Sequence, residues 1–135
     1  MPDLYKRDLK KAARRHLEAA DHLPPTRKDV AGYLYGLAAE MAVKEMMIQC
    51  GYRPNKEDKS GPFWCHFPDL KSQLLDMPVG RYGTPLMSLV RSFKLEDWNT
   101  TMRYSAGSSV TQKIMEKWQT AAKSAVSLMD NGGFK

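Results

Sequence analysis

One stretch of the sequence leaves little freedom in what the chain can fold into, and that stretch is the apolar run from Val30 to Ile48. Apolar or small residues point in almost every direction of a helix here, so that no clear wet face remains. A helix that is hydrophobic all round belongs in the middle of its protein. Glu40 and Lys44 are the charges at its centre, four residues apart in the acid-first order that favours an ion pair. We therefore expect a central buried helix that the rest of the chain surrounds.

Start and stop signals bound this central helix. Thr26 and Asp29 fit a capping box at its start, and Gly51 is a natural stop at its end. Gly32 and Gly36 lie one turn apart along it. Because glycine costs helix stability, the pair indicates that a neighbouring element packs closely at this point.

Apolar residues at helical spacing predict four more helices. Their expected starts are Pro2-Asp3, Pro68, Thr84-Pro85, and a capping box of Ser109 with Gln112. The first helix ends near Leu23, before two prolines, and the last ends at Asn131-Gly-Gly. The inward positions are Tyr5, Leu9, Ala12, Ala13, His16, Leu17 and Ala20; Leu70, Leu74 and Leu75; Leu86, Leu89, Val90 and Phe93; and Val110, Ile114, Trp118, Ala121, Ala125 and Leu128.

The segments between these helices contain no predicted strand. Residues 52–65 and 77–83 have the proline, glycine and charged residues of loops, and residues 95–104 either form a short separate turn or continue the fourth helix after a bend. No segment alternates apolar and polar residues as a strand does. A chain of 135 residues is long enough for one hydrophobic core. We therefore predict a single all-α domain over residues 1–135, an antiparallel bundle of about five helices around a central hydrophobic helix.

Composition favours an intracellular protein. Charges at Glu40, Lys44 and Glu45 interrupt the longest apolar run, so we expect no membrane span, and the polar start of the chain lacks a signal-peptide core. Cys50 and Cys65 are too few for a disulfide framework, so we expect reduced thiols and a cytoplasmic location. The familiar phosphate-loop, zinc and nucleophile motifs are missing from the sequence, and we expect no metal and no cofactor.

Positive charge is densest on the first predicted helix of a chain whose net charge is +6. Its face opposite the apolar stripe holds Lys6, Arg7, Lys10, Lys11, Arg14 and Arg15, relieved only by Asp8. Such a face is either an ordinary solvated surface or a phosphate-contacting one, where long cations supply salt-sensitive affinity for any sequence. Four of these residues are candidates for binding RNA or nucleotide phosphate: Lys10, Lys11, Arg14 and Arg15.

Two further places are candidates for a binding groove. Trp98, Arg103 and Tyr104 lie within about one and a half turns if this segment is helical. Arg103 either contacts a phosphate or a base, or pairs with Glu40 in the core. His66 stands just before the third helix, where it caps that helix or lies at the mouth of the long loop. We therefore add His66, Arg103 and Tyr104 to the candidate binding residues.

The central helix reads Tyr33-Leu-Tyr-Gly-Leu-Ala-Ala-Glu-Met-Ala-Val-Lys44, and it is followed by His66-Phe-Pro-Asp-Leu70 and by Trp98-x4-Arg103-Tyr104. Together these segments resemble HEPN domains, a family of small helical bundles named for nucleotide binding in higher eukaryotes and prokaryotes. In that family the second helix typically reads tyrosine, aliphatic, x, Gly, x, Ala, x, Glu, x, x, Leu, Lys. A His–x–Leu element opens the next helix, and Trp–x4–Arg–Tyr comes late. The resemblance spans about residues 8–130.

The resemblance implies one of two kinds of activity. Many HEPN domains are metal-independent ribonucleases of toxin–antitoxin, CRISPR and anti-phage systems, with an Arg and a His separated by four to six residues and usually contributed across a homodimer. In such a site the His transfers protons while the Arg holds the phosphate. Other HEPN domains lack the pair and bind RNA, a nucleotide or a protein, often beside a nucleotidyltransferase.

This sequence departs from the ribonuclease pattern, because no His follows Arg91 or Arg103. The literal match is Arg15 with His22, which lie in the first helix, and we interpret it as a coincidence. We therefore assign no catalytic residue. We expect a HEPN-like module that binds RNA, a nucleotide or a protein partner in a prokaryotic nucleic-acid-related system of the defence or toxin–antitoxin type, as a homodimer or with another protein.

Two alternative functions stay open at this point. The first is a metal-independent ribonuclease whose atypical site forms when folding or dimerisation brings His66 or His22 to an Arg. The second is a purely protein-interacting subunit of a larger complex, whose basic face meets an acidic partner.

Overall fold

The computed structural model describes residues 7–54, 57, 61–77 and 84–132. Within these residues the chain forms five α-helices, three short 3₁₀ turns and no strand. The helices are α1 (Leu9–Asp21), α2 (Lys28–Gln49), α3 (Asp69–Leu75), α4 (Thr84–Ser92) and α5 (Gln112–Asn131), and the 3₁₀ turns are η1 (Pro25–Arg27), η2 (Pro62–Trp64) and η3 (Thr100–Tyr104). The predicted all-α bundle of about five helices is confirmed.

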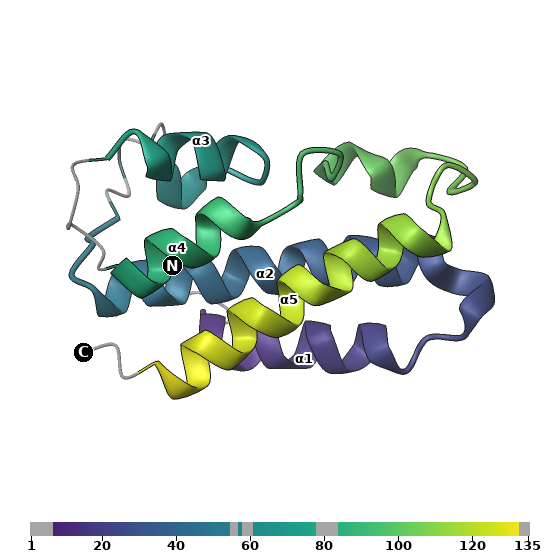
Figure 1. The fold of residues 1–135 in the computed structure, drawn as a ribbon, viewed down its shortest axis with the longest axis horizontal. Helices are drawn as coiled ribbons and strands as arrows, with labels where there is room; N and C mark the ends of the chain where they lie inside the picture. Colours follow the sequence, from purple (N-terminus) through teal and green to yellow (C-terminus); the bar gives the residue numbers. More distant parts are fainter. Residues whose placement is uncertain (1–6, 55–56, 58–60, 78–83, 133–135) are drawn as a thin grey trace.

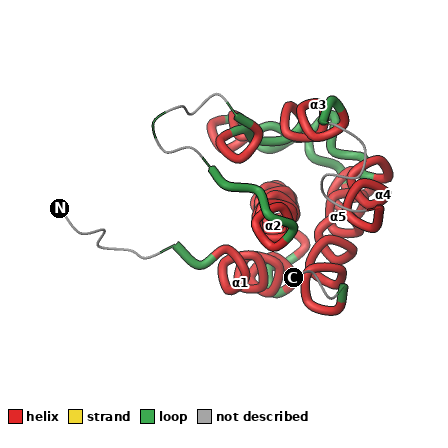
Figure 2. Tube along the Cα trace, turned by 90° about the vertical axis from the view of Figure 1, so that its left-hand side faces the viewer, coloured by secondary structure: helices red, strands yellow, loops and turns green. Residues whose placement is uncertain are grey.

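Helix α2 lies at the centre of the bundle. Figure 2 shows it almost end-on, with α1, α3, α4 and α5 around it. Figure 1 shows α1 running antiparallel to α2, whereas α5 runs in the same direction as α2 because the long connection through α3, α4 and η3 returns the chain to its starting end. Twelve residues of α2 are buried, Glu40 and Lys44 among them. None of the helices in the described residues is long and apolar enough to cross a membrane.

Helix α1 begins later than predicted. Arg7 and Asp8 lie before the helix, and the Asp8 carboxylate accepts a hydrogen bond from the Lys11 amide at 3.0 Å. Asp8 is therefore the N-cap, a position that favours a short acid. A helix that starts at Pro2-Asp3 would include Arg7 and Asp8, which are not helical, so the prediction is wrong for these two residues. Residues 1–6 lie outside the described residues.

Two predicted capping boxes are also wrong. Thr26 lies inside η1, and no side-chain hydrogen bond caps the start of α2. At α5 the cap is Thr111, whose hydroxyl accepts from the Ile114 amide at 3.2 Å, and not Ser109. Ser108, Ser109 and Thr111 all precede α5, and spacing alone does not decide which of these hydroxyl residues adopts the cap geometry.

The end of α2 matches the prediction. Gly51 has a φ of +107°, a conformation that glycine adopts without a steric penalty. Its amide donates to the Ile48 carbonyl at 3.0 Å, and the Tyr52 amide donates to the Met47 carbonyl at 3.0 Å. This pair of bonds is a Schellman motif, which satisfies carbonyls that the last helical turn leaves open.

The elements on the long connection mostly bury the residues expected of them. Leu70 and Leu74 of α3 are buried, but Leu75 is 39% exposed, so its predicted inward position is wrong. Helix α4 ends at Ser92, and residues 100–104 form η3, so the separate turn is the correct one of the two predicted forms. The predicted loop at 77–83 falls outside the described residues except for its first position.

The two glycines of α2 make room for two tryptophans. A Cβ added to Gly36 would lie 2.0 Å from Trp98 Nε1, and one added to Gly32 would lie 2.7 Å from Trp118 Cε3. Trp98 is fully buried, and its indole N–H donates to the Gly32 carbonyl at 3.2 Å. The prediction that close packing requires these glycines is confirmed.

A polar clamp joins α1, α2 and α5. The Tyr35 hydroxyl donates to Asp21 at 2.5 Å and accepts from Gln119 Nε2 at 2.9 Å, while Gln119 also donates to Asp21 at 3.2 Å. Burial of the ring, followed by the hydrogen bond to Asp21, raises the pKa of Tyr35 well above its usual value. Tyr35 is therefore protonated in these hydrogen bonds at neutral pH.

We predict that Gly36→Ala destabilises the fold although alanine is the better helix former. Propensity alone favours alanine by about 1 kcal/mol. The clash with Trp98 costs more, so we expect a net loss of about 1–3 kcal/mol in the free energy of unfolding, measured by urea denaturation. Ser127→Ala on the exposed face of α5 is the control and should be neutral or stabilising. A gain of stability in Gly36→Ala would contradict the observed packing.

We predict a stability loss at high pH that depends on Tyr35. The pKa of Tyr35 is raised in the folded chain, so above about pH 10 the unfolded chain releases a proton that the folded chain keeps. The stability that this shift in the pKa of Tyr35 contributes is thus fully present below about pH 10, and it falls as the pH rises further. Urea denaturation at several pH values should show a smaller fall for Tyr35→Phe, which costs about 1 kcal/mol at neutral pH. Parallel curves for the two proteins would count against the clamp.

Candidate functional site

Four residues lie along one side of α2, and they contact segments that are far away in the sequence. Tyr33, Gly36, Glu40 and Lys44 follow one another at spacings of three or four residues, which places them on one face. We call this face the polar stripe. Residues 61–67 and 93–104 cover it, because both segments contact its members.

Glu40 is a buried carboxylate with two nitrogen partners. It is 5% exposed, Lys44 Nζ lies 3.1 Å from its Oε2, and His66 Nδ1 lies 3.0 Å from each of its oxygens. Lys44 is also buried, and its ammonium lies 5.6 Å from the centre of the Phe63 ring. Buried charges are tolerated where they are paired and hydrogen-bonded, and this cluster meets both conditions.

The bond to Glu40 orients the His66 ring. A carboxylate only accepts hydrogen bonds, so Nδ1 is assigned the proton and Nε2 is the nitrogen turned away from Glu40. The side chain is 53% exposed. Beside it lies a hollow of about 350 Å³ whose lining includes Asp69, Asn99 and Thr100. Nε2 is therefore the nitrogen open to solvent or to a ligand.

Arg103 and Tyr104 lie on η3, at the other end of the polar stripe. Arg103 donates to the Tyr33 hydroxyl at 3.2 Å, and its guanidinium carbon lies 4.9 Å from the centre of the Tyr104 ring. Tyr104 is 77% exposed, while Tyr33 stacks on Trp98 with 5.8 Å between ring centres. Tyr33 and Arg103 also line a hollow of about 190 Å³. The result is an exposed pair of a cation and an aromatic ring at the rim of a hollow.

One of the two predicted roles of Arg103 is wrong. Arg103 does not pair with Glu40, because Lys44 and His66 occupy that carboxylate and Arg103 reaches Tyr33 instead. The exposed position leaves the other predicted role, contact with a phosphate or a base, as a prediction. The hydrogen bond to Tyr33 raises the pKa of Arg103, so the guanidinium stays charged.

The basic face of α1 is partly engaged within the protein. Arg14 donates to Asp130 of α5 through Nε at 3.0 Å and Nη2 at 2.5 Å. Arg7 lies over the Phe63 and Trp64 rings, at 5.1 Å and 6.0 Å from their centres. Lys11 and Arg15 are exposed, and Lys10 is partly buried. Arg14 therefore fastens α1 to α5, while Lys10, Lys11 and Arg15 keep their candidate role.

The predicted residues fall into two separate groups. His66, Arg103 and Tyr104 gather along the polar stripe. Helix α1 instead packs on the side of α2 that carries Tyr35, two residues and more than half a turn away from Tyr33. Helix α1 and η3 thus pack on different sides of α2, α1 on the side of Tyr35 and η3, which carries Arg103 and Tyr104, on the side of Tyr33.

Comparison of the chain with protein-family models, with curated proteins and with solved structures found no match. Within the described residues, no group of three His, Cys, Asp or Glu side chains is placed to hold a metal ion. Cys50 and Cys65 remain thiols, and burial raises the pKa of Cys65 above its usual value. The chemistry of the site therefore rests on the polar stripe and the segments that cover it.

We predict that neutralising Glu40 is costly unless Lys44 is neutralised as well. Glu40→Gln leaves the Lys44 ammonium buried without its counter-charge, and we expect a loss of about 3 kcal/mol in the free energy of unfolding. The double change Glu40→Gln/Lys44→Met should recover most of that loss, a coupling that a double-mutant cycle in urea measures. Glu96→Gln, which opens the exposed pair with Lys71, is the control and should cost less than about 1 kcal/mol. Equal losses of unfolding free energy in Glu40→Gln and in Glu96→Gln would contradict a buried Glu40–Lys44 pair.

Proposed function

We propose that this chain is a HEPN-like helical module that binds single-stranded RNA without cleaving it. The observation that carries the proposal is the exposed Arg103–Tyr104 pair at the rim of the hollow beside Tyr33. RNA-binding surfaces stack unpaired bases on aromatic rings and on guanidinium planes, and they hold phosphates with arginine. This pair offers both kinds of contact within one short turn.

The surroundings of the pair favour ligand binding over packing. Tyr104 is 77% exposed, so its ring contributes little to the core of the described chain. Arg103 is held in place by the Tyr33 hydroxyl, and the stacked Tyr33 and Trp98 rings fix that hydroxyl in turn. A guanidinium that is oriented before binding loses less conformational entropy when a ligand arrives. The hollow alongside leaves space for a base or a phosphate.

The contacts along the polar stripe support the HEPN-like part of the proposal. The three segments that carry the resemblance touch one another there: Tyr33 meets Arg103, Gly36 meets Trp98, and Glu40 meets His66. Residues that are far apart in the sequence have a physical reason to occur in the same chain when they contact one another in the fold, as these residues do. A prokaryotic defence or toxin–antitoxin setting, and assembly as a homodimer or with a protein partner, are parts of the proposal that rest on the resemblance.

The basic face of α1 contributes in a different way. Its exposed cations Lys11 and Arg15, together with the net charge of +6, attract any polyanion over a distance of about 10 Å at moderate salt. Because α1 lies on a different side of α2, these residues add affinity for all sequences and do not stack bases. We therefore assign RNA contact to Arg103 and Tyr104 and long-range attraction to α1.

The Glu40–His66 pair favours ribonuclease activity as a second candidate function. A carboxylate that holds Nδ1 leaves Nε2 in position to take a proton from a hydroxyl in the neighbouring hollow. In the described chain, however, the His66 side chain makes its hydrogen bonds with Glu40 and none with an arginine. A monomer of this arrangement lacks the cation that would stabilise a phosphoryl transition state.

We predict that Tyr104→Ala and Arg103→Ala each weaken the binding of a fluorescent single-stranded RNA, measured by anisotropy. Loss of one stacking contact should cost about 1–3 kcal/mol. Tyr104→Phe keeps a ring and should keep most of the affinity. Arg53→Ala removes one exposed arginine elsewhere and is the matched control for Arg103→Ala. Charge reversal at Lys11 and Arg15 should weaken every RNA similarly and reduce the dependence of affinity on salt.

Three results would overturn the proposal. Unchanged affinity in both Arg103→Ala and Tyr104→Ala would remove the assigned site. Absence of RNA binding, with stoichiometric co-purification of another protein, would favour the protein-interacting subunit. Cleavage of RNA in the presence of a chelator, lost in His66→Ala and kept in His22→Ala, would favour the ribonuclease.

A further inference from the structure

Asp29 places a carboxylate in the hollow that borders the Arg103–Tyr104 pair. The residue lies in the first turn of α2 and is half-buried, and it lines the same hollow of about 190 Å³ as Tyr33 and Arg103. A carboxylate repels the phosphates of a nucleic acid, so it is out of place on a surface that only holds phosphates. Its presence beside an exposed arginine and an exposed aromatic ring therefore indicates a contact of another kind.

The backbone at Gly107 packs closely on the Asp29 side chain. A Cβ added to Gly107 would lie 2.4 Å from Asp29 Oδ2 and 2.9 Å from its Cγ. Gly107 also has a φ of +84°, which other residues rarely adopt, so both the space and the backbone conformation require glycine here. Within the described residues the Asp29 carboxylate makes no hydrogen bond and no ion pair. It is thus held by packing, and its oxygens remain available as acceptors.

Two neighbouring acceptor oxygens match the Watson–Crick edge of one RNA base. A carboxylate only accepts hydrogen bonds, and its two oxygens can accept side by side. Guanine presents two neighbouring donors on this edge, N1–H and the 2-amino group. Adenine and cytosine present one amino group beside a ring nitrogen that is an acceptor, and uracil presents one N–H between two carbonyls. A carboxylate therefore bonds guanine twice and opposes an acceptor of every other base.

Arg103, the cation that lines the same hollow, favours the same base. Among contacts between arginine and base edges, donation to guanine O6 and N7 is the commonest specific one. Arg103 uses Nη1 for the Tyr33 hydroxyl, and its other N–H groups remain as donors. Guanine O6 is next to N1 on the ring, so an acid and an arginine on one hollow can contact adjacent edges of a single guanine.

We propose that this hollow selects guanine in single-stranded RNA, with Asp29 as the specificity-determining residue. The inference rests on the proposed RNA-binding function and adds a base preference to it. The base lies against the Arg103–Tyr104 pair, its Watson–Crick edge meets Asp29, and Arg103 donates to O6 or N7. The hollow is smaller than the roughly 300–1,000 Å³ of sites for drug-sized ligands, so it accepts the edge of one base and not a whole nucleotide.

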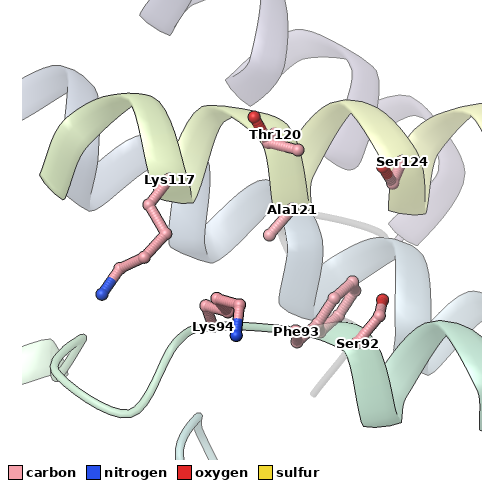
Figure 3. Close-up of a pocket in the computed structure, with 7 residues that line it drawn as sticks. All are labelled: Ser92, Phe93, Lys94, Lys117, Thr120, Ala121 and Ser124. Atoms are coloured by element: carbon pink, nitrogen blue, oxygen red, sulfur yellow. The ribbon is translucent and has the colours of Figure 1, made fainter. Parts of the chain in front are cut away.

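A second hollow, between α5 and residues 92–94, lacks the groups for base selection (Figure 3). Its charged lining residues are Lys94 and Lys117, and its described lining includes no carboxylate. Lys117 Nζ lies 3.4 Å from Asp97, which offsets part of the positive charge. Lysines of this kind attract the phosphates of any sequence and do not distinguish bases. Base selection therefore belongs to the hollow that Asp29 lines.

The test compares short fluorescent RNAs by anisotropy: oligouridine, and the same RNA with one central guanosine, adenosine, cytidine or inosine. The guanosine RNA should bind about tenfold more tightly than the uridine, adenosine and cytidine RNAs, because it alone makes both bonds to the carboxylate. Inosine keeps N1–H and O6 but lacks the 2-amino group, so it should lose a large part of this gain. These comparisons use the unmodified protein and need no variant.

Asp29→Asn tests the residue itself and should abolish the preference for the guanosine RNA. It should leave the affinity for oligouridine unchanged or raised, because a charge that repels phosphates is removed. Asp76→Asn, at the exposed end of α3, makes the same chemical change away from the hollow and should keep the preference. Urea denaturation of Asp29→Asn shows whether the variant stays folded.

The outcomes separate this inference from the RNA-binding function. Equal affinity for the guanosine, adenosine and uridine RNAs would overturn the base preference and leave RNA binding in place. A guanosine preference that persists in Asp29→Asn would also overturn it. Failure of every RNA to bind would overturn both proposals. Arg103→Ala should weaken all the RNAs, whereas Asp29→Asn should change the choice of base.

Discussion

The close approach of Trp98 to α2 at Gly36 is the contact on which the rest of the site depends. A tryptophan ring reaches the helix backbone only where the helix has no Cβ, and the indole N–H then bonds the Gly32 carbonyl. This contact holds the start of η3 against α2. Arg103 and Tyr104 follow within two turns, so their position on the surface is set by a residue that is itself fully buried.

The buried Glu40 is the complementary constraint. Its charge requires partners, and it takes one from its own helix and one from the segment before α3. Such a cluster restrains where residues 63–67 lie along α2, because a shift of one residue would remove the His66 bond and leave the buried carboxylate with Lys44 alone. The polar stripe therefore positions both covering segments. Residues 93–104 are held by the packing of Trp98 at Gly36, and residues 61–67 by the bond of His66 to Glu40.

Periodicity predicted the elements better than it predicted their partners. The all-round apolar run identified α2 as central, and the glycines identified a close neighbour, because both signals are local. Which tryptophan fills the glycine gap and which histidine meets Glu40 are long-range facts, and the His66 contact spans 26 residues. The Arg103–Glu40 pairing failed for this reason, since the charges were complementary but Lys44 and His66 lay nearer. A usable signal was present in the spacing of Tyr33, Gly36, Glu40 and Lys44, which puts the buried ion pair, a glycine and an aromatic ring on one face of the helix.

The most direct test of the account is to find where RNA touches the protein. Single-stranded RNA that contains 4-thiouridine can be crosslinked to the wild-type chain by light, and the adducts can be located by mass spectrometry. Binding on the polar stripe predicts adducts at Tyr104 and at its neighbours on η3, which disappear in Gly36→Ala if that variant displaces Trp98. Adducts confined to α1, with none on η3, would contradict the central claim that the polar stripe organises the RNA-binding surface.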